Sequence, residues 1–315
     1  MESSSVRFTN VDGINIDSEW EGLGVTAQFL DNAELYDHRY FKSSYWTYLV
    51  ERGLSMAGVD RPSITRVLDV GSGSGNTVMP ALEFLPNASI VASDISPQLL
   101  AILRRHLFNS QHSARDVSLY CFDLQKDAFD AQSFDLVIGG AVLHHMLDPA
   151  AALRNIAKWI RRGGHIVLYE PLDYGAHIFA TLFQLLVDEL AESTDANDQM
   201  CVSAFNAFKD DIHARLGVPS VKPWTAALDD KWYFNLNYLR TLGLQLGLKG
   251  PRVFPLSNDC ERYFNENILG LLSALGQSNL RIKSNAQSII DQFDQGITSS
   301  LKRLFLLEGI VVFTK

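Results

Sequence analysis

The chain has 315 residues, of which 47% are hydrophobic and 20% charged, a composition that predicts an ordinary globular protein and excludes a disordered one. Its net charge is -9 and its lysines and arginines form no run, which argues against a nucleic-acid partner. The N-terminus lacks a basic and apolar leader, no window holds ~18 apolar residues, and the three cysteines lie far apart. We therefore expect no membrane span, no disulfide framework and a cytoplasmic location.

The first 60 residues are expected to form an N-terminal helical segment. The stretch from Glu19 to Met56 reads as helical and is rich in aromatic residues, which include Tyr36 and Tyr45. Most of these aromatic side chains are expected to pack in the core.

Short apolar runs alternate with amphipathic helices between Arg66 and Pro171, which is the pattern of a parallel α/β sheet. Several of the runs are almost continuously apolar, as strands buried on both faces should be. The predicted strands are Arg66–Val70, Ser89–Ser93, Ser118–Phe122, Phe134–Gly139 and His165–Glu170.

Two of the connecting helices carry clear start signals. Ser96 is a predicted N-cap followed by Pro97, and Asp148 is a predicted N-cap followed by Pro149. The second helix is expected to run through "AAALRNIAKWIRR" and to end at Gly163 and Gly164.

Two helical insertions are expected after this region, over residues 173–231 and 258–302. Between them, "NYLRTLGLQLGLKGPRVFPL" predicts a helix that runs into a strand, and the terminal "LFLLEGIVVFTK" has the β-branched content of a last strand.

The stretch "VLDVGSGSGN", Val67 to Asn76, places three glycines directly after a buried strand. A strand, a tight glycine turn and a helix bring bare backbone amides against a polar ligand at a helix N-terminus. The dinucleotide fingerprint would require glycine at position 76, where this chain has asparagine. Asp94 and Asp123 end the next two strands, where a carboxylate can accept ribose hydroxyls or an adenine amine.

Taken together, "VLDVGSGSGN", "VASDIS", "CFDL" and "SFDLVIGGAVLHHM" resemble the motifs of the class I S-adenosylmethionine-dependent methyltransferases. The resemblance covers Tyr36 to Pro171, with a weaker echo to Lys315. It implies an α/β, Rossmann-like, doubly wound sheet of seven strands with the last strand antiparallel. The core would then comprise residues 61–172, 232–257 and 303–315, and the two helical insertions would form a lid over the substrate.

The same resemblance implies S-adenosyl-L-methionine as the cofactor and assigns its contacts. The residues expected to bind it are Asp69, Gly71, Ser72 and Gly73 around the methionine part, Asp94 and Ile95 at the ribose, Asp123 and Leu124 at the adenine, Gly140 on the sulfonium side, and Tyr36.

Methyl transfer from a sulfonium depends mainly on positioning, and a base is needed only where the acceptor must lose a proton. The groups expected at the carboxyl ends of the strands are His144, His145 and Glu170, of which Glu170 is the preferred base.

The acceptor is expected to contact aromatic residues of the N-terminal segment and of the insertions. Those chosen are Tyr45, Tyr174, Trp224 and Trp232. No compact cluster of histidine, cysteine and aspartate is apparent in the sequence, so no metal site is predicted, although a diphosphate acceptor could bring its own magnesium.

The sequence thus predicts an enzyme that methylates oxygen, nitrogen or carbon of a small molecule, such as a secondary metabolite, a sugar or an isoprenoid intermediate. A homo-oligomer is compatible with the sequence. Two alternatives stay open: a nicotinamide-dependent oxidoreductase of the Rossmann type, and a protein that binds S-adenosylmethionine without catalysis.

Overall fold

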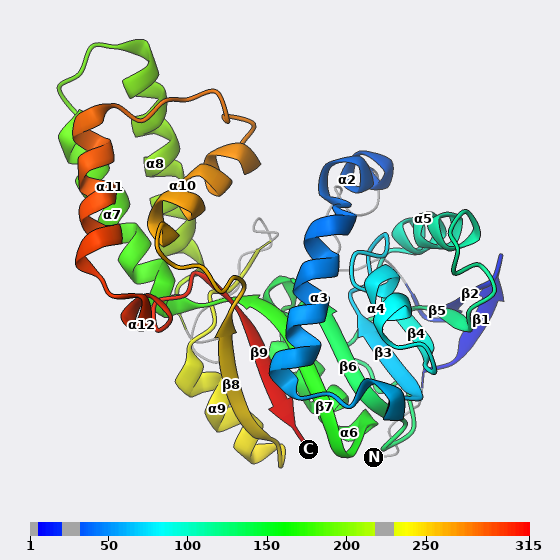
Figure 1. The fold of residues 1–315 in the computed structure, drawn as a ribbon. Coiled ribbons are helices and arrows are strands. Elements are labelled where there is room, and N and C mark those ends of the chain that lie inside the picture. Colours follow the sequence, from blue (N-terminus) through cyan, green and yellow to red (C-terminus); the bar gives the residue numbers. More distant parts are fainter. Residues whose placement is uncertain (1–5, 21–31, 218–229) are drawn as a thin grey trace.

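The computed structural model describes residues 6–20, 32–217 and 230–315, and these form a sheet with helices on both faces and a further group of helices beyond one end (Figure 1). Within the described residues the sheet has nine strands. In spatial order they are β1 (Phe8–Val11), β2 (Ile14–Asp17), β5 (Val117–Cys121), β4 (Ser89–Asp94), β3 (Arg66–Val70), β6 (Phe134–Gly140), β7 (Ile160–Pro171), β9 (Glu308–Thr314) and β8 (Lys249–Pro255).

The predicted α/β fold is confirmed, and the predicted number of strands is wrong. Seven strands, β3 to β9, follow the expected plan, in which the last strand runs antiparallel to both neighbours. The two additional strands, β1 and β2, form a hairpin whose β2 pairs in parallel with β5. The N-terminal segment is therefore not helical throughout.

The hairpin has a physical cause in the sequence. Asp12 and Gly13 join β1 to β2 with φ of 49° and 79°. Positive φ at both central residues, with an Asp-Gly pair, is the usual two-residue hairpin turn.

Helices cover both faces of the sheet, as a doubly wound fold requires (Figure 1). The face formed by Val67, Ile90 and Ile138 packs against α3, α4 and α5, and the opposite face packs against α6 and α9. The bounds of these helices are α3 (Ser43–Ala57), α4 (Val78–Phe84), α5 (Pro97–Phe108), α6 (Pro149–Trp159) and α9 (Leu236–Gln245).

Both predicted N-caps are confirmed: Ser96 accepts a hydrogen bond from Leu99 N at the start of α5, and Asp148 accepts one from Ala151 N at the start of α6. The predicted end of α6 is wrong, because the helix stops at Trp159. The following residues enter β7 at Ile160, which pairs with Phe134, so that the two glycines lie within the strand.

A separate group of helices stands beyond the sheet, where β7 ends and β9 begins (Figure 1). Its helices pack around their own buried core, which includes Phe183, Phe205 and Phe264. They are α7 (Asp173–Leu190), α8 (Ala196–Arg215), α10 (Tyr263–Ala274) and α11 (Ser284–Gly296), with the short α12 (Ser299–Lys302) leading into β9.

Candidate active site

The turn between β3 and α4 contains three glycines with positive φ, 65° at Gly71, 51° at Gly73 and 112° at Gly75. Their surroundings differ. A Cβ atom at Gly71 would lie 2.3 Å from Val142, and one at Gly75 would lie 2.6 Å from Leu103. At Gly73 a Cβ atom would meet nothing within 4 Å. Gly71 and Gly75 are thus required by packing, whereas Gly73 lies on the open side of the turn.

Asp94, at the end of β4, holds this turn. One carboxylate oxygen accepts a hydrogen bond from Gly73 N at 2.8 Å, and the other accepts one from Ser96 N at 2.8 Å. Burial raises the pKa of Asp94, while these amide donors oppose the shift. Each carboxylate oxygen has two acceptor positions, so Asp94 can accept further donors from a ligand.

Asp69, the next-to-last residue of β3, is fully buried, and neither of its carboxylate oxygens has a well-formed hydrogen bond within the described residues. Burial raises its pKa to about 7, although the hydroxyls of Thr77 and Ser72 act in the opposite direction. A buried carboxylate without a good partner is unusual, and it fits a site that receives a cationic or hydrogen-bonding ligand.

The remaining residues predicted for the cofactor lie around the same strand ends. Asp123 accepts a hydrogen bond from Gln125 N at 2.9 Å, next to the buried Leu124. Ile95 O accepts one from the Trp20 indole at 3.0 Å.

Helices from the N-terminal segment lie close to two further predicted cofactor residues. Gly140 faces Trp46 of α3, because a Cβ atom there would lie 2.7 Å from the indole. Tyr36, on α2 (Ala33–Tyr40), has its pKa raised by burial and by the nearby charge of Asp94. These two helices therefore approach the strand ends on which the predicted cofactor residues lie.

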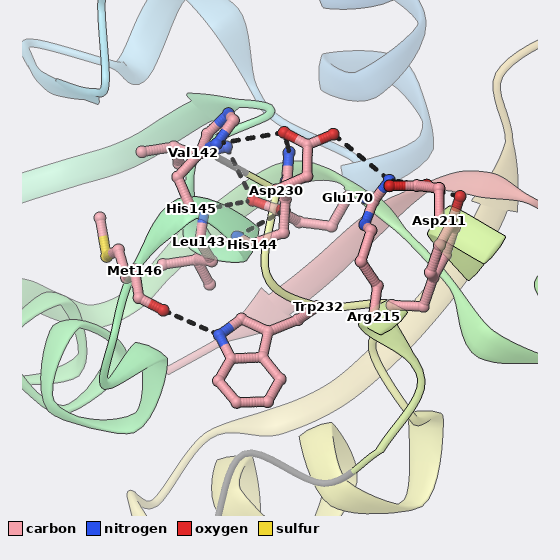
Figure 2. Close-up of polar contacts among 11 residues, drawn as sticks. Val142, Leu143, His144, His145, Met146, Glu170, Asp211, Arg215, Asp230 and Trp232 are labelled. Atoms are coloured by element: carbon pink, nitrogen blue, oxygen red, sulfur yellow. Dashed lines mark hydrogen bonds and ion pairs between the residues drawn. The ribbon is translucent and has the colours of Figure 1, made fainter. Parts of the chain in front are cut away.

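Glu170, near the end of β7, is 2% exposed, and both of its carboxylate oxygens are engaged (Figure 2). Oε1 accepts hydrogen bonds from Val142 N at 3.1 Å and Leu143 N at 2.8 Å. Oε2 accepts from His144 N at 3.3 Å and lies 2.7 Å from His144 Nδ1. This network orders the loop after β6, and the role of Glu170 as a base stays a prediction.

His144 lies between two carboxylates. Its Nδ1 faces Glu170, and its Nε2 lies 3.6 Å from Asp230 Oδ1. Burial lowers the pKa of His144, but the two carboxylates outweigh this effect and raise it to about 9. The ring of His145 lies beside that of His144, with centroids 4.1 Å apart, and its Nδ1 is 3.3 Å from Asp230 Oδ1.

Asp230 reaches this loop because the residues after it dock on the core (Figure 2). Lys231 N donates to His144 O at 2.8 Å, the Trp232 indole donates to Met146 O at 2.8 Å, and Phe234 N donates to Pro171 O at 2.9 Å. Burial tends to raise the pKa of Asp230, but His144, Arg215 and His145 hold it well below its usual range. The Arg215 guanidinium lies 3.3 Å from Asp230 Oδ2.

The residues predicted for the acceptor are placed differently from one another. Trp232 is 1% exposed and donates a hydrogen bond to the loop, so it lies in the core, and its contact with the acceptor stays a prediction. Trp224 lies outside the described residues. Tyr45 and Tyr174 are both exposed, on α3 and at the start of α7.

Glu308, the first residue of β9, was not predicted for the site. Its side chain is exposed, yet burial among neighbouring groups raises its pKa, with His144 and Arg215 acting in the opposite direction. Burial and the charge of Glu308 also raise the pKa of Tyr45 to about 12, which places Tyr45 near Glu308.

Sequence reasoning missed Asp230 and Arg215 as partners of the histidine pair. "DDK" was visible as a charged group among aromatic residues, but nothing in its local pattern indicates contact with residues 144 and 145. The contact depends on how the distant segment docks.

The sheet and the glycine turn define a Rossmann-like fold, and the comparisons find a family model that matches part of the chain. Residues 68–166 match the family model described as "Methyltransferase domain". This part of the chain is thus similar to methyltransferase domains, in agreement with the class I motifs that it carries.

Curated relatives match over the same region. Aklanonic acid methyltransferase DauC of Streptomyces sp. (strain C5) is 32% identical over 108 residues, which is 34% of this chain and 48% of that protein. The matched segment thus spans about half of this relative.

Solved structures share the fold over most of the chain. The [4+2]-cyclase SpnF has a TM-score of 0.51 at 16% identity, covering 85% of this chain and 81% of that one. Magnesium protoporphyrin IX methyltransferase (ChlM) from Synechocystis PCC 6803, solved with bound SAH, has a TM-score of 0.51 at 12% identity, covering 92% and 96%. None of the described helices is long and apolar enough to cross a bilayer.

Proposed function

We propose that this protein is an S-adenosylmethionine-dependent methyltransferase that acts on a small-molecule acceptor. The observation that carries the proposal is the open side of the glycine turn at Gly73, bordered by Asp94 and by the poorly partnered, buried Asp69. The methyltransferase domain matched over residues 68–166 supports the same function.

The chain offers a contact for each part of the donor. Asp94 would accept the ribose hydroxyls, because its oxygens retain acceptor positions after binding two amides. Asp69 would face the ammonium of the methionine part, where a positive charge would favour its ionised form. Ile95, Asp123 and Leu124 would surround the adenine. The bound donor supplies a methyl group already activated on sulfonium.

The acceptor end of the site would be the cluster of His144, His145 and Asp230, with Glu308 and the exposed Tyr45 nearby. At pH 7 the raised pKa keeps His144 protonated in the ligand-free protein, so His144 alone is a poor base. Asp230 is the negatively charged group of this pair, and its side chain is 43% exposed. We propose that the Asp230–His144 pair accepts the proton that the methyl acceptor loses, and that Glu170 holds the loop after β6 in place.

The acceptor is proposed to be a small organic molecule, since the relative DauC is named for methylating aklanonic acid. Because the similar structure SpnF is a cyclase, the fold does not fix the reaction, and transfer must be measured.

The test is titration calorimetry of the purified protein with S-adenosylmethionine and, separately, with NAD, followed by transfer of labelled methyl to a panel of phenols, enols, carboxylic acids and amines. We expect binding of S-adenosylmethionine alone and transfer to at least one acceptor class. Binding of NAD in preference to the methyl donor would overturn the proposal, and donor binding without any transfer would leave a non-catalytic binding protein.

A further inference from the structure

Ligating atoms from two distant parts of the chain converge beside the end of β6 (Figure 2). One ligand atom from each of His144, His145 and Asp230 lies within 4.8 Å of those of the other two. The histidines come from the short 3-10 turn Leu143–His145, and Asp230 comes from the segment that docks on it. The sequence had predicted no metal site, because this grouping exists only in the fold.

The separations fit a shared metal ion better than direct hydrogen bonds. Asp230 Oδ1 is 3.6 Å from His144 Nε2 and 3.3 Å from His145 Nδ1. A charge-assisted hydrogen bond would measure ~2.7–2.9 Å. A tetrahedral zinc ion with bonds of ~2.0–2.1 Å separates its ligands by about 3.3–3.4 Å. An octahedral magnesium ion would need about 2.9 Å and favours oxygen ligands.

A neighbouring charged side chain orients His144, and another orients Asp230. Glu170 Oε2 lies 2.7 Å from His144 Nδ1, which directs His144 Nε2 toward Asp230. Arg215 lies 3.3 Å from Asp230 Oδ2 and leaves Oδ1 toward the histidines. A carboxylate on the far nitrogen of a histidine is the usual support of a metal-ligating imidazole.

The cluster is also accessible. The side chains of His145 and Asp230 are 28% and 43% exposed, whereas that of His144 is 7% exposed. An ion could therefore enter from the exposed side while His144 stays fixed on the buried side.

We propose that His144, His145 and Asp230 bind one zinc ion and leave a fourth position open. The three protein ligands follow from the geometry alone. The identity of the fourth ligand rests on the proposed function, which this inference deepens. With the ion bound, Asp230 and His144 would act as ligands and not as the base. An oxygen atom of the acceptor would take the fourth position, where the ion would lower the pKa of its hydroxyl, which favours a phenol or an enol over an amine or an alkene as substrate.

The test uses the full chain, freed of metal with a chelator, and measures binding of Zn²⁺ by calorimetry and of Co²⁺ by its visible absorption. We expect one Zn²⁺ per chain and the intense absorption of tetrahedral Co²⁺. Asp230→Asn and His145→Gln should each weaken Zn²⁺ binding at least tenfold. Glu170→Gln, which removes the support of His144, should weaken it about 10- to 100-fold.

The matched control is Asp211→Asn. Asp211 also contacts Arg215, at 2.9 Å, but is not one of the ligands, so its variant should bind Zn²⁺ as the wild type does. Circular dichroism of each variant checks the fold. If Asp230→Asn unfolds, His145→Gln carries the test.

The inference is overturned if the wild type binds no stoichiometric Zn²⁺, or if Asp230→Asn and His145→Gln bind it with wild-type affinity. Donor affinity measured on the same samples separates the two proposals. Binding of S-adenosylmethionine without Zn²⁺ removes only the metal site, and binding of Zn²⁺ without S-adenosylmethionine removes only the proposed function.

Discussion

Gly71 and Gly73 show how two neighbouring glycines of one turn can serve different purposes. Both have positive φ, but a side chain at Gly71 would meet Val142, while one at Gly73 would enter open space. A side chain at position 73, rather than one at position 71, would therefore enter the expected path of the donor.

We predict that Gly73→Ala weakens S-adenosylmethionine binding at least tenfold, because its methyl group would enter the open side of the turn. The left-handed backbone should cost about 1–2 kcal/mol of stability. Gly71→Ala should cost more, about 2–4 kcal/mol, because strain and overpacking against Val142 add. Calorimetry and urea unfolding measure the two effects. Normal donor binding by Gly73→Ala would show that this open side does not face the donor.

Asp94 joins the turn to the sheet, and we predict that Asp94→Ala weakens donor binding by about 1.5–3 kcal/mol, the cost of losing charge-assisted hydrogen bonds. Some stability should also be lost, since Gly73 N and Ser96 N lose their acceptor. The exposed Asp60 provides the control, and Asp60→Ala should bind the donor normally. Calorimetry decides, and equal affinity of both variants would exclude Asp94 from the donor site.

At the scale of helices and strands, the sequence predicts those features that depend on interactions between residues close together in the chain. Ser96 and Asp148 cap their helices as expected, because an N-cap needs only amides two or three residues ahead. The β1–β2 hairpin could have been predicted from its Asp-Gly pair. The end of α6 could not, because Ile160 leaves the helix to pair with Phe134 of a neighbouring strand.

The residues of the candidate site also fall into those that local sequence patterns reveal and those that depend on distant contacts. The glycine turn and Asp94 lie at strand ends that the sequence pattern reveals. The roles of Glu170, Asp230 and Trp232 depend on contacts across 26 residues or more, which no local pattern encodes.

The segment that carries Asp230 is anchored by Trp232, which is buried and donates to Met146 O. We predict that Trp232→Ala destabilises the protein by about 3–5 kcal/mol through the cavity it leaves. Trp232→Phe should cost less, since it removes the hydrogen bond but keeps much of the packing. Chemical denaturation measures both, and a Trp232→Ala protein as stable as wild type would show that the segment is not anchored here.

For the whole molecule, the sheet and the group of helices beyond it meet at the candidate site. β7 leads into α7, and α12 leads into β9. Glu170 is the next-to-last residue of β7, and Glu308 is the first residue of β9, so both lie where the chain passes between the sheet and these helices. Arg215, at the end of α8, reaches Asp230 from the helical side. Ionisation of this cluster should therefore affect the stability of the whole fold.

The pH dependence follows from His144, whose pKa rises from 6.5 to about 9 on folding. A group with a raised folded pKa contributes stability that is complete below its unfolded pKa and is lost as pH rises through its folded value. The metal-free protein should thus lose stability between about pH 6.5 and pH 9. Asp69, whose pKa rises from 3.8 to about 7, also loses its contribution as pH rises, but over a lower range that ends near pH 7. The lowered pKa of Asp230 leaves its contribution constant across the range in which His144 titrates.

We predict that Asp230→Asn flattens this decline, because removing one carboxylate brings the pKa of His144 closer to its ordinary value. The measurement is Tm from pH 6 to 9.5 in the presence of a chelator, for the wild type, Asp230→Asn and the control Asp211→Asn. The wild type and Asp211→Asn should fall steeply and in parallel, and Asp230→Asn should start lower and fall less. Parallel curves for all three proteins would mean that Asp230 does not hold the proton on His144.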